Sequence, residues 1–267
     1  MRAGDSWDAF TGKLGFDYRT GAGHLLYVTA SKGFKSGIFP SQNNVIASVG
    51  EATPPEKVWS YEAGAKTQWL DNRLRVNLAL FLMDYEDLQL FRLDSALRLV
   101  TFTEDTTNQG AELEILAAPL DGLEIGVNAA YLKAEVDGGA NDGAELPRAP
   151  ESTLGGFVQY ALPVPGGSLT LRADAKWTDD YRTELAYNTG APAADAANAR
   201  ITAVDSFTMV DARVAWALEE HNLELALWGK NLADELYPTH IIPFLGNGFS
   251  IFGAPRTYGV SVSWKSR

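Results

Sequence analysis

The most constraining feature of this sequence is a pair of long segments, 60–69 and 74–82, in which side-chain character alternates. In the first segment the odd-numbered positions carry Tyr, Ala, Ala, Thr and Trp, and the even-numbered positions carry Ser, Glu, Gly, Lys and Gln. A period of two is that of a β-strand, whose successive side chains point to opposite faces of a sheet. Asp71-Asn72, between the segments, is a turn signal. The sequence therefore predicts a β-hairpin with one apolar and one polar face.

The arms of this hairpin are each about ten residues long, which is the length of a tilted strand that crosses a bilayer. Strands in soluble sheets are more often about five or six residues long. The same alternation recurs along the chain and predicts about eleven long strands in one domain, 1–267. The predicted strands are 8–19, 24–34, 60–69, 74–93, 97–118, 123–131, 154–162, 168–178, 210–218, 223–232 and 258–264.

Tight turns alternate with longer connections between these strands. Four connections (35–56, 135–150, 181–204 and 234–254) run to about 15 to 25 residues, and one near 94–97 is brief. Short turns on one side and long loops on the other are typical of outer-membrane barrels, in which the loops face outside. Aromatic residues near strand ends fit the girdles at the two membrane interfaces. They are Tyr18, Trp69, Tyr131, Trp177 and Trp264. An odd number of strands cannot close by antiparallel pairing, so we expect either a miscounted strand or part of a larger barrel.

Composition excludes several classes of protein. No apolar run approaches the roughly 20 residues of a membrane-spanning helix, so a helical membrane protein is excluded. The chain has 34 acidic and 22 basic residues, a net charge of −12, which argues against a nucleic-acid-binding protein. It has no cysteine, so a thiolate nucleophile and a soft-metal site are impossible. The N-terminus has no secretory signal, which predicts a mature or truncated chain, or one that stays inside the cell.

Five local sequences resemble successive landmarks of the TonB-dependent outer-membrane receptor barrel, in the order of that family. They are SKGFKSG at 31–37, SYEAGAK at 60–66, QGAELE at 109–114, WGKNLADELY at 228–237 and PRTYGV at 255–260. The resemblance covers nearly the whole chain. It implies an all-β fold, an antiparallel transmembrane barrel of about 22 strands, of which this chain is the C-terminal half.

The resemblance also implies a function and partners. The complete protein would take up a scarce nutrient, such as a ferric siderophore, across the cell outer membrane. Its partners would be outer-membrane lipid, the missing plug and N-terminal half of the barrel, and, in the full-length form, the TonB complex. Nothing in the sequence resembles the plug domain or the TonB-contacting box. The family usually ends on an aromatic residue, whereas Lys265-Ser266-Arg267 follow Trp264 here, which puts efficient membrane insertion in doubt.

Ligand contacts are expected on the long loops, because binding residues concentrate on loops carried by a rigid frame. The aromatic or polar-aromatic candidates there are Phe39, Tyr187, His240, Phe244, Phe249 and Phe252. In the receptor interpretation, the polar faces of the strands would line the barrel lumen and face the plug. The expected lumen-facing residues are Glu62, Lys66, Arg73, Arg75, Glu112, Glu114, Arg172, Asp174 and Arg213.

The sequence offers little catalytic chemistry, and we predict no catalytic residue, no metal site and no cofactor. The three histidines lie in separate segments, and there is no G-x-S-x-G or H-E-x-x-H motif. Glu112 and Glu114 share one strand face and are either an acid–base pair or, as we favour, solvated charges. Four residues of one Gly-rich loop could hold Ca²⁺, but an acidic turn is the favoured interpretation. They are Asp137, Asn141, Asp142 and Glu145.

Two other functional hypotheses stay open from the sequence. One is a self-contained small outer-membrane barrel, either a porin or a surface enzyme, which needs an even number of strands. The other is a soluble β-rich binding module, which predicts a core packed between two sheets.

Overall fold

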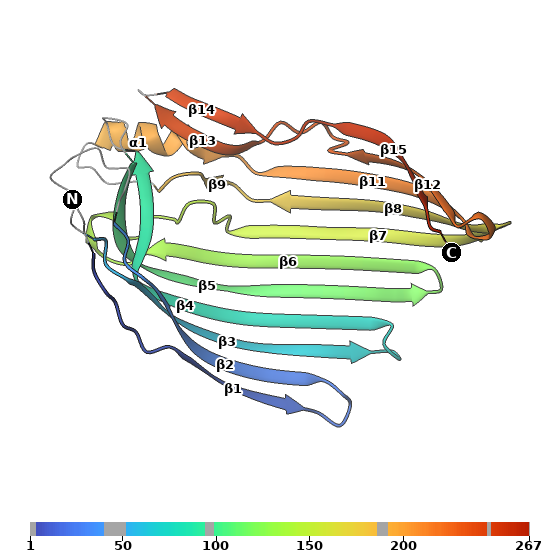
Figure 1. The fold of residues 1–267 in the computed structure, drawn as a ribbon, viewed down its shortest axis with the longest axis horizontal. Coiled ribbons are helices and arrows are strands. Elements are labelled where there is room, and N and C mark those ends of the chain that lie inside the picture. Colours follow the sequence, from blue (N-terminus) through green and yellow to red (C-terminus); the bar gives the residue numbers. More distant parts are fainter. Residues whose placement is uncertain (1–3, 40–51, 94–98, 186–191, 245–246, 267) are drawn as a thin grey trace.

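The computed structural model describes residues 4–39, 52–93, 99–185, 192–244 and 247–266. Eleven long strands form one antiparallel sheet in the order β1-β2-β3-β4-β5-β6-β7-β8-β11-β12-β15 (Figure 1). The predicted number of strands and the all-β class are confirmed. The strands are β1 (Gly12–Arg19), β2 (Leu25–Lys35), β3 (Glu56–Trp69), β4 (Leu74–Leu93), β5 (Leu99–Leu120), β6 (Leu123–Val136), β7 (Ser152–Val164), β8 (Gly167–Thr178), β11 (Phe207–Leu218), β12 (Leu223–Lys230) and β15 (Thr257–Trp264).

The long connections contain more regular structure than the sequence predicts. The β8–β11 connection holds β9 (Tyr181–Arg182), α1 (Pro192–Ile201) and β10 (Ala203–Val204), and β9 pairs with β10. The β12–β15 connection holds a hairpin of β13 (Pro238–Phe244) and β14 (Asn247–Phe252). These elements are short and lack a sustained period, so contacts between loops decide their structure. None of the described helices is long and apolar enough to cross a membrane.

The sheet has one apolar and one polar face, as the alternation predicts. Cross-strand partners point to the same side of a sheet, and the register places Val28, Ala63 and Leu80 in one row across three strands. The apolar face is uncovered: Leu80 is 52% exposed and Tyr258 is 80% exposed. An exposed apolar face that extends over the whole sheet requires contact with an apolar medium or partner. No second layer of the described residues covers it, so a soluble sandwich with a core between two sheets is excluded.

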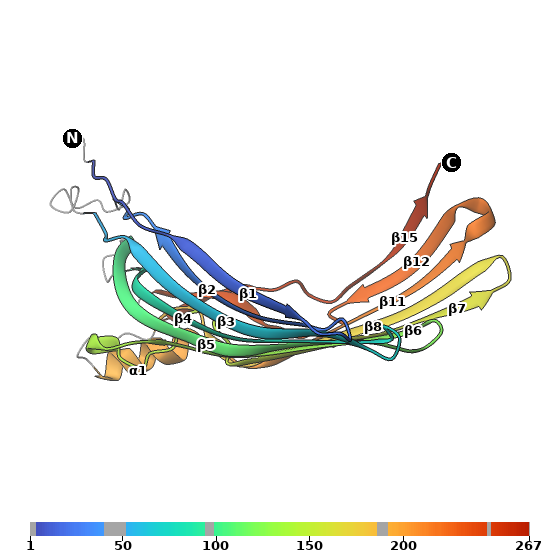
Figure 2. The ribbon, with the colours of Figure 1, turned by 90° about the horizontal axis from the view of Figure 1, so that it is seen from below.

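The sheet is curved and open. Figure 2 shows the two edge strands, β1 and β15, rising on the same side of the central strands, so that the sheet forms a trough. The two edge strands do not pair with each other, so a closed small barrel is not formed. Tight turns lie at one end of the strands, whereas α1 and the β13–β14 hairpin lie at the other, which we call the loop end (Figure 1). A small apolar cluster of Ala134, Val136, Leu146 and Leu185 is buried near the loop end.

Glycines on the polar face accommodate aromatic rings of the neighbouring strand. In four directly opposed pairs a Cβ atom on the glycine would lie closer than 3.0 Å to an atom of the aromatic ring. The pairs are Tyr27–Gly64, Phe81–Gly110, Phe157–Gly126 and Trp228–Gly259. The rings therefore lie across the strands instead of standing up from the sheet, which joins neighbouring strands and leaves room above them.

Candidate functional site

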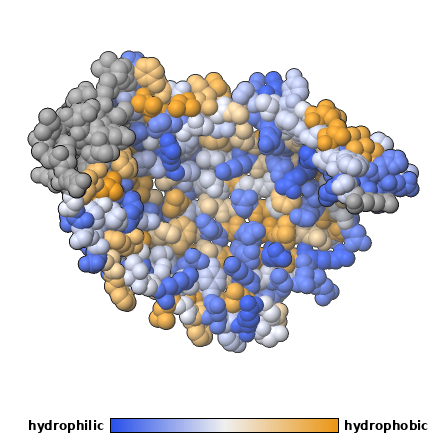
Figure 3. All heavy atoms as spheres, in the orientation of Figure 1, coloured by the Kyte–Doolittle hydropathy of each residue, from blue (hydrophilic) through white to orange (hydrophobic). Residues whose placement is uncertain are grey.

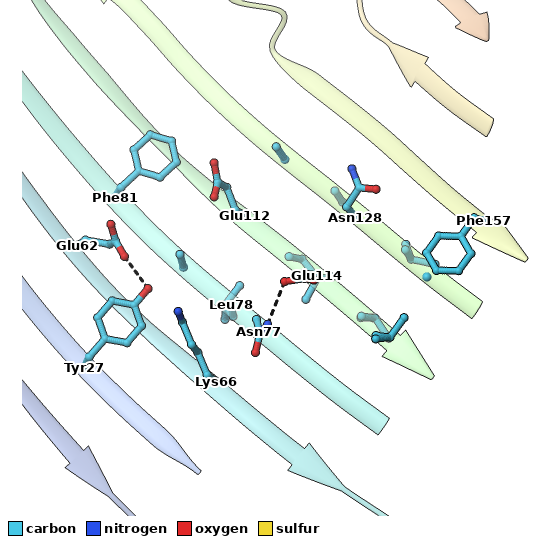
Figure 4. A pocket seen from close by; sticks show the side chains of 18 of the residues that line it. Tyr27, Glu62, Lys66, Asn77, Leu78, Phe81, Glu112, Glu114, Asn128 and Phe157 are labelled. Carbon is cyan, nitrogen blue, oxygen red and sulfur yellow. Dashed lines mark hydrogen bonds between the residues drawn. The ribbon is translucent and has the colours of Figure 1, made fainter. Parts of the chain in front are cut away.

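The polar face of the sheet is hollowed over β2 to β7, with a cavity volume of about 810 Å³. Hydrophilic side chains gather over the middle of the face seen in Figure 3, with apolar ones between them. At one side of the hollow the Tyr27 hydroxyl donates a hydrogen bond to Glu62 Oε1 at 2.5 Å (Figure 4). Farther along, Asn77 Nδ2 donates to Glu114 Oε2 at 2.9 Å. The hollow is thus lined by polar groups that are held in place across strands.

A second group of ion pairs continues this face over β7 to β12. Arg172 makes bidentate bonds to Asp174, the shorter at 2.6 Å, and its guanidinium lies 3.9 Å from the centre of the Phe157 ring. Arg213 pairs with Glu224 at 2.6 Å. These residues are only partly exposed, and their charges are largely compensated within the face. Such a surface suits a polar partner that packs against it through hydrogen bonds and water.

At the loop end, three residues from three different connections meet, and we call them the rim junction: Arg148, Glu184 and His240. Arg148 Nη2 lies 3.0 Å from His240 Nδ1, and His240 Nε2 lies 4.0 Å from Glu184 Oε1. Because a guanidinium can only donate, His240 Nδ1 accepts, and the neutral ring carries its proton on Nε2. Backbone bonds support the junction, since the Arg148 amide donates to the Arg182 carbonyl and Thr183 Oγ1 donates to the Ile241 carbonyl.

The environment of the rim junction shifts two ionisation equilibria. Burial lowers the pKa of the His240 imidazole from its usual value, and the Arg148 cation lowers it further. Burial raises the pKa of the Glu184 carboxyl, while Arg148 acts in the opposite direction. His240 is therefore neutral at neutral pH and can serve as the hydrogen-bond acceptor of Arg148.

Comparison with known proteins identifies the fold at the level of family. A family model described as "TonB dependent receptor-like, beta-barrel" matches residues 2–232. The chain belongs to the TonB-dependent receptor family. TonB-dependent receptors are β-barrels of the Gram-negative outer membrane, so the uncovered apolar face of the sheet is its lipid-facing side.

Individual TonB-dependent receptors resemble most of this chain. The ferric-pyoverdine 358 receptor of Pseudomonas putida is 24% identical over 233 residues, which are 85% of this chain and 26% of that receptor. The crystal structure of the ferric yersiniabactin uptake receptor of Yersinia pestis matches this chain with a TM-score of 0.75 at 17% identity. The match includes 94% of this chain and 36% of the receptor chain. The ferric-catecholate import receptor of Escherichia coli K12 matches with a TM-score of 0.69 at 21% identity. This match includes 94% of this chain and 34% of the receptor chain. This chain thus spans about a quarter to a third of these receptors.

The structure places most of the expected lumen-facing residues of this TonB-dependent receptor chain on the polar face. Glu62, Lys66, Glu112 and Glu114 line the large hollow, and Arg75 lines a smaller one beside it. Arg172, Asp174 and Arg213 lie on the same face over later strands. Arg73 instead belongs to the turn before β4, where its guanidinium lies 3.4 Å from Asp121 of the next turn.

The expected ligand-binding residues that the structure describes lie at the loop end, but they do not all come together. His240, Phe249 and Phe252 belong to the β13–β14 hairpin, and the two phenylalanines are 58% and 49% exposed. Phe39 follows β2 and packs near Trp7, with ring centroids 6.1 Å apart. Phe244 is the last residue of β13, and Tyr187 lies outside the described residues.

Sequence reasoning missed two members of the rim junction, Arg148 and Glu184. Neither lies in a motif or an alternating segment, and Arg148 and His240 are separated by 92 positions. Arg148 has a left-handed backbone, with φ of 59°, directly after Pro147. A sequence could suggest a turn there, but it could not name the partner.

The acidic loop 137–145, the candidate Ca²⁺ loop, is held by hydrogen bonds within the loop and to β5. The carboxylate of Asp137 accepts from Thr107 Oγ1 at 2.5 Å, that of Asp142 accepts from the Gly138 amide at 2.6 Å, and Asn141 donates to Glu104. Glu145 lies 3.8 Å from Arg182. Within the described part of the chain, no three His, Asp or Glu residues are grouped so that they could hold a metal ion.

Proposed function

We propose that this chain is the C-terminal half of the barrel of an outer-membrane receptor that takes up a ferric siderophore. The observation that carries the proposal is the two-faced sheet, whose fold matches solved siderophore receptors over 94% of the chain. The named relatives are receptors for ferric pyoverdine and ferric yersiniabactin. The plug, the N-terminal half of the barrel and the TonB complex are the partners that this proposal requires.

The two ends and faces of the sheet then have separate tasks. The polar face, with its compensated ion pairs, faces the plug. The loop end captures the ligand, with Phe39, Tyr187, His240, Phe244, Phe249 and Phe252 as the candidate contacts. Aromatic side chains supply large apolar contact areas to a chelate of this size. Capture is followed by a rearrangement of the plug that is driven from the inner membrane.

We propose that the chain binds and transports, and that it carries out no chemical reaction on its ligand. His24 lies against Trp69 at the turn end, with ring centroids 4.4 Å apart. His221 lies in the turn between β11 and β12, and His240 lies at the loop end. Glu112 and Glu114 lie on the open polar face of β5, which is three strands away from β2, the strand that follows His24. General acid–base catalysis requires such groups to meet around one substrate.

A chimeric receptor tests the proposed function. The 233-residue region of the ferric-pyoverdine 358 receptor is replaced by the matching residues of this chain, in cells that lack the parental receptor. Uptake of radiolabelled iron is measured with a panel of hydroxamate, catecholate and mixed-ligand siderophores. We expect TonB-dependent uptake of at least one ferric siderophore.

Membrane insertion of the chimera is checked separately by its heat-modifiable migration in gels. A chimera that inserts but imports no ferric siderophore of the panel contradicts the proposed function. The matched control is the same chimera carrying Leu80→Arg, a charge on the lipid-facing side, which we expect to lower the inserted fraction.

A further inference from the structure

The rim junction brings together residues from three inter-strand segments that are far apart in the sequence. Arg148 belongs to the β6–β7 connection, Glu184 to the β8–β11 connection and His240 to β13 of the β12–β15 connection. The last two are also joined by Tyr181, whose hydroxyl donates to the Pro238 carbonyl at 3.3 Å. The side chain of Arg148 reaches β13 directly through its contact with His240, whereas its amide is bonded to the Arg182 carbonyl of β9. The protonation state of one imidazole therefore decides whether this contact holds.

Neutral and protonated His240 favour different partners. Neutral His240 accepts a hydrogen bond from Arg148 through Nδ1. A protonated imidazole is a donor at both nitrogens and has no acceptor to offer, and its charge repels the guanidinium 3.0 Å away. The protonated ring retains only Glu184, whose Oε1 lies 4.0 Å from Nε2. Acid thus breaks the side-chain contact with Arg148 and strengthens the attraction between His240 and Glu184.

We propose that the rim junction is a pH-sensitive clasp: neutral His240 holds the Arg148 side chain of the β6–β7 connection against the β13–β14 hairpin, and protonation of His240 releases this contact. A role of the clasp in ligand capture rests on the proposed function. The pH-dependent movement of the loops does not depend on the proposed function. The candidate contacts Phe249 and Phe252 lie on the same hairpin, so release changes the loop end where the ligand would bind.

The other charged groups near the clasp do not replace His240. The β6–β7 connection adds Glu145, which lies 3.8 Å from Arg182 of β9. Arg182 also donates to the Ala199 carbonyl. The helix α1, which contacts β13, carries Asp195 and the exposed Arg200, and β14 carries no titratable group. His240 is the one group among these with an ordinary pKa, 6.5, near neutral pH.

The direction of the pH effect follows from the environment of His240. Its pKa is lower in the closed clasp than its ordinary value of 6.5, so the closed form binds fewer protons than the open form. The clasp is therefore fully stable above about pH 6.5, and its stability is lost as the pH falls below that value. In this window the ratio of open to closed forms rises by up to about tenfold for each pH unit. Burial raises the pKa of the Glu184 carboxyl, and protonation of this carboxyl removes its attraction for the charged ring.

Distance measurements between two spin labels test the clasp in the complete receptor that contains this chain. The chain has no cysteine, so labels can be placed at Ala140→Cys in the β6–β7 connection and Ser250→Cys in β14. Both positions are exposed. We expect one narrow distance distribution at about pH 7.5 and a longer, broader one at about pH 5. An unchanged distribution over this range overturns the proposal.

Three variants assign any response to the clasp. His240→Asn keeps an acceptor for Arg148 but does not titrate, so we expect the closed distribution at both pH values. Arg148→Met removes the donor, and we expect the open distribution at both. His221→Asn, at the turn end, should respond as the parent does. If His240→Asn opens in acid as the parent does, the clasp is refuted.

Uptake of ferric siderophore by the same receptors separates the two proposals. Loops that open in acid in a receptor that imports no siderophore leave the clasp intact and contradict the proposed function. Uptake without any acid-dependent opening contradicts the clasp alone.

Discussion

At the scale of single residues, the glycines of the polar face matter as much as the charges. The chain needs long strands, and glycine weakens a strand interior, yet Gly126 lies directly opposite Phe157. A side chain at Gly126 would occupy the space of the ring. Phe157 in turn supports the guanidinium of Arg172, 3.9 Å from the ring centre. The glycine therefore positions an aromatic ring, and the ring positions an ion pair.

We predict that Gly126→Ala destabilises the receptor by about 1–3 kcal/mol, because the added methyl group forces Phe157 out of its place. Urea unfolding in lipid vesicles, followed by tryptophan fluorescence, measures the change. Gly12→Ala is the matched control, since a Cβ atom at Gly12 in β1 meets nothing within 4 Å. Combining Gly126→Ala with Phe157→Leu should recover part of the loss, and additive effects of the two substitutions would contradict the explanation.

At the scale of elements, Asn231 fixes the end of β12 and the connection that follows. It is 1% exposed and has a left-handed backbone, with φ of 49°. Its Nδ2 donates to the carbonyls of Glu235 and Ala254, and its Oδ1 accepts from the Glu235 amide. The Asn231 amide itself donates to Asp211 Oδ1 on the neighbouring strand. One side chain thus closes a connection of more than twenty residues between β12 and β15.

We predict that Asn231→Ala destabilises the receptor by about 2–4 kcal/mol, because it leaves buried backbone groups without partners. The β12–β15 connection should become more sensitive to protease. Thermal unfolding and limited proteolysis measure the two effects. Asn222→Ala is the control for the cost of placing alanine in a left-handed backbone, since Asn222 is exposed and has a φ of 51°. We expect Asn222→Ala to destabilise the receptor by only about 1 kcal/mol. Equal losses in the two variants would show that the hydrogen bonds of Asn231 contribute nothing.

At the scale of the whole molecule, the sheet is stable only with lipid on one face. Large apolar side chains are exposed along every strand of the described sheet, and the buried apolar cluster is small. Lipid on the apolar face and water or a polar partner on the other make one layer sufficient. The same two-sidedness makes the effect of a charge depend on the face that carries it.

We predict that Leu80→Arg destabilises the membrane-inserted receptor by about 2–4 kcal/mol, because it places a charge in the hydrocarbon layer. Ala79→Arg, one residue earlier at nearly the same depth, points into the polar hollow beside Glu112 and should have little effect. Urea unfolding in vesicles compares the two variants. Similar losses in both would contradict the assignment of the faces.

The sequence by itself determined the strands and their faces. Alternation is a local signal with a period of two, so a long run of it specifies both a strand and the side on which each residue lies. Eleven strands, an apolar outer face and a polar inner face were all predictable for this reason. The ion pair between Arg73 and Asp121 of the next turn does not follow from alternation, because both residues lie in turns. The roles of the loop aromatics in ligand binding stay predictions.

Only the tertiary structure decided what the polar residues and the loops do. The register of the strands pairs Asn77 with Glu114 and places Phe157 over Gly126, and neither pairing follows from the composition of one strand. The helix α1 and the β13–β14 hairpin depend on contacts with each other, as between Ile201 and Gly248. The rim junction joins residues as much as 92 positions apart. Periodicity acts over a few residues, whereas these contacts exist only once the sheet has brought distant loops to the same end.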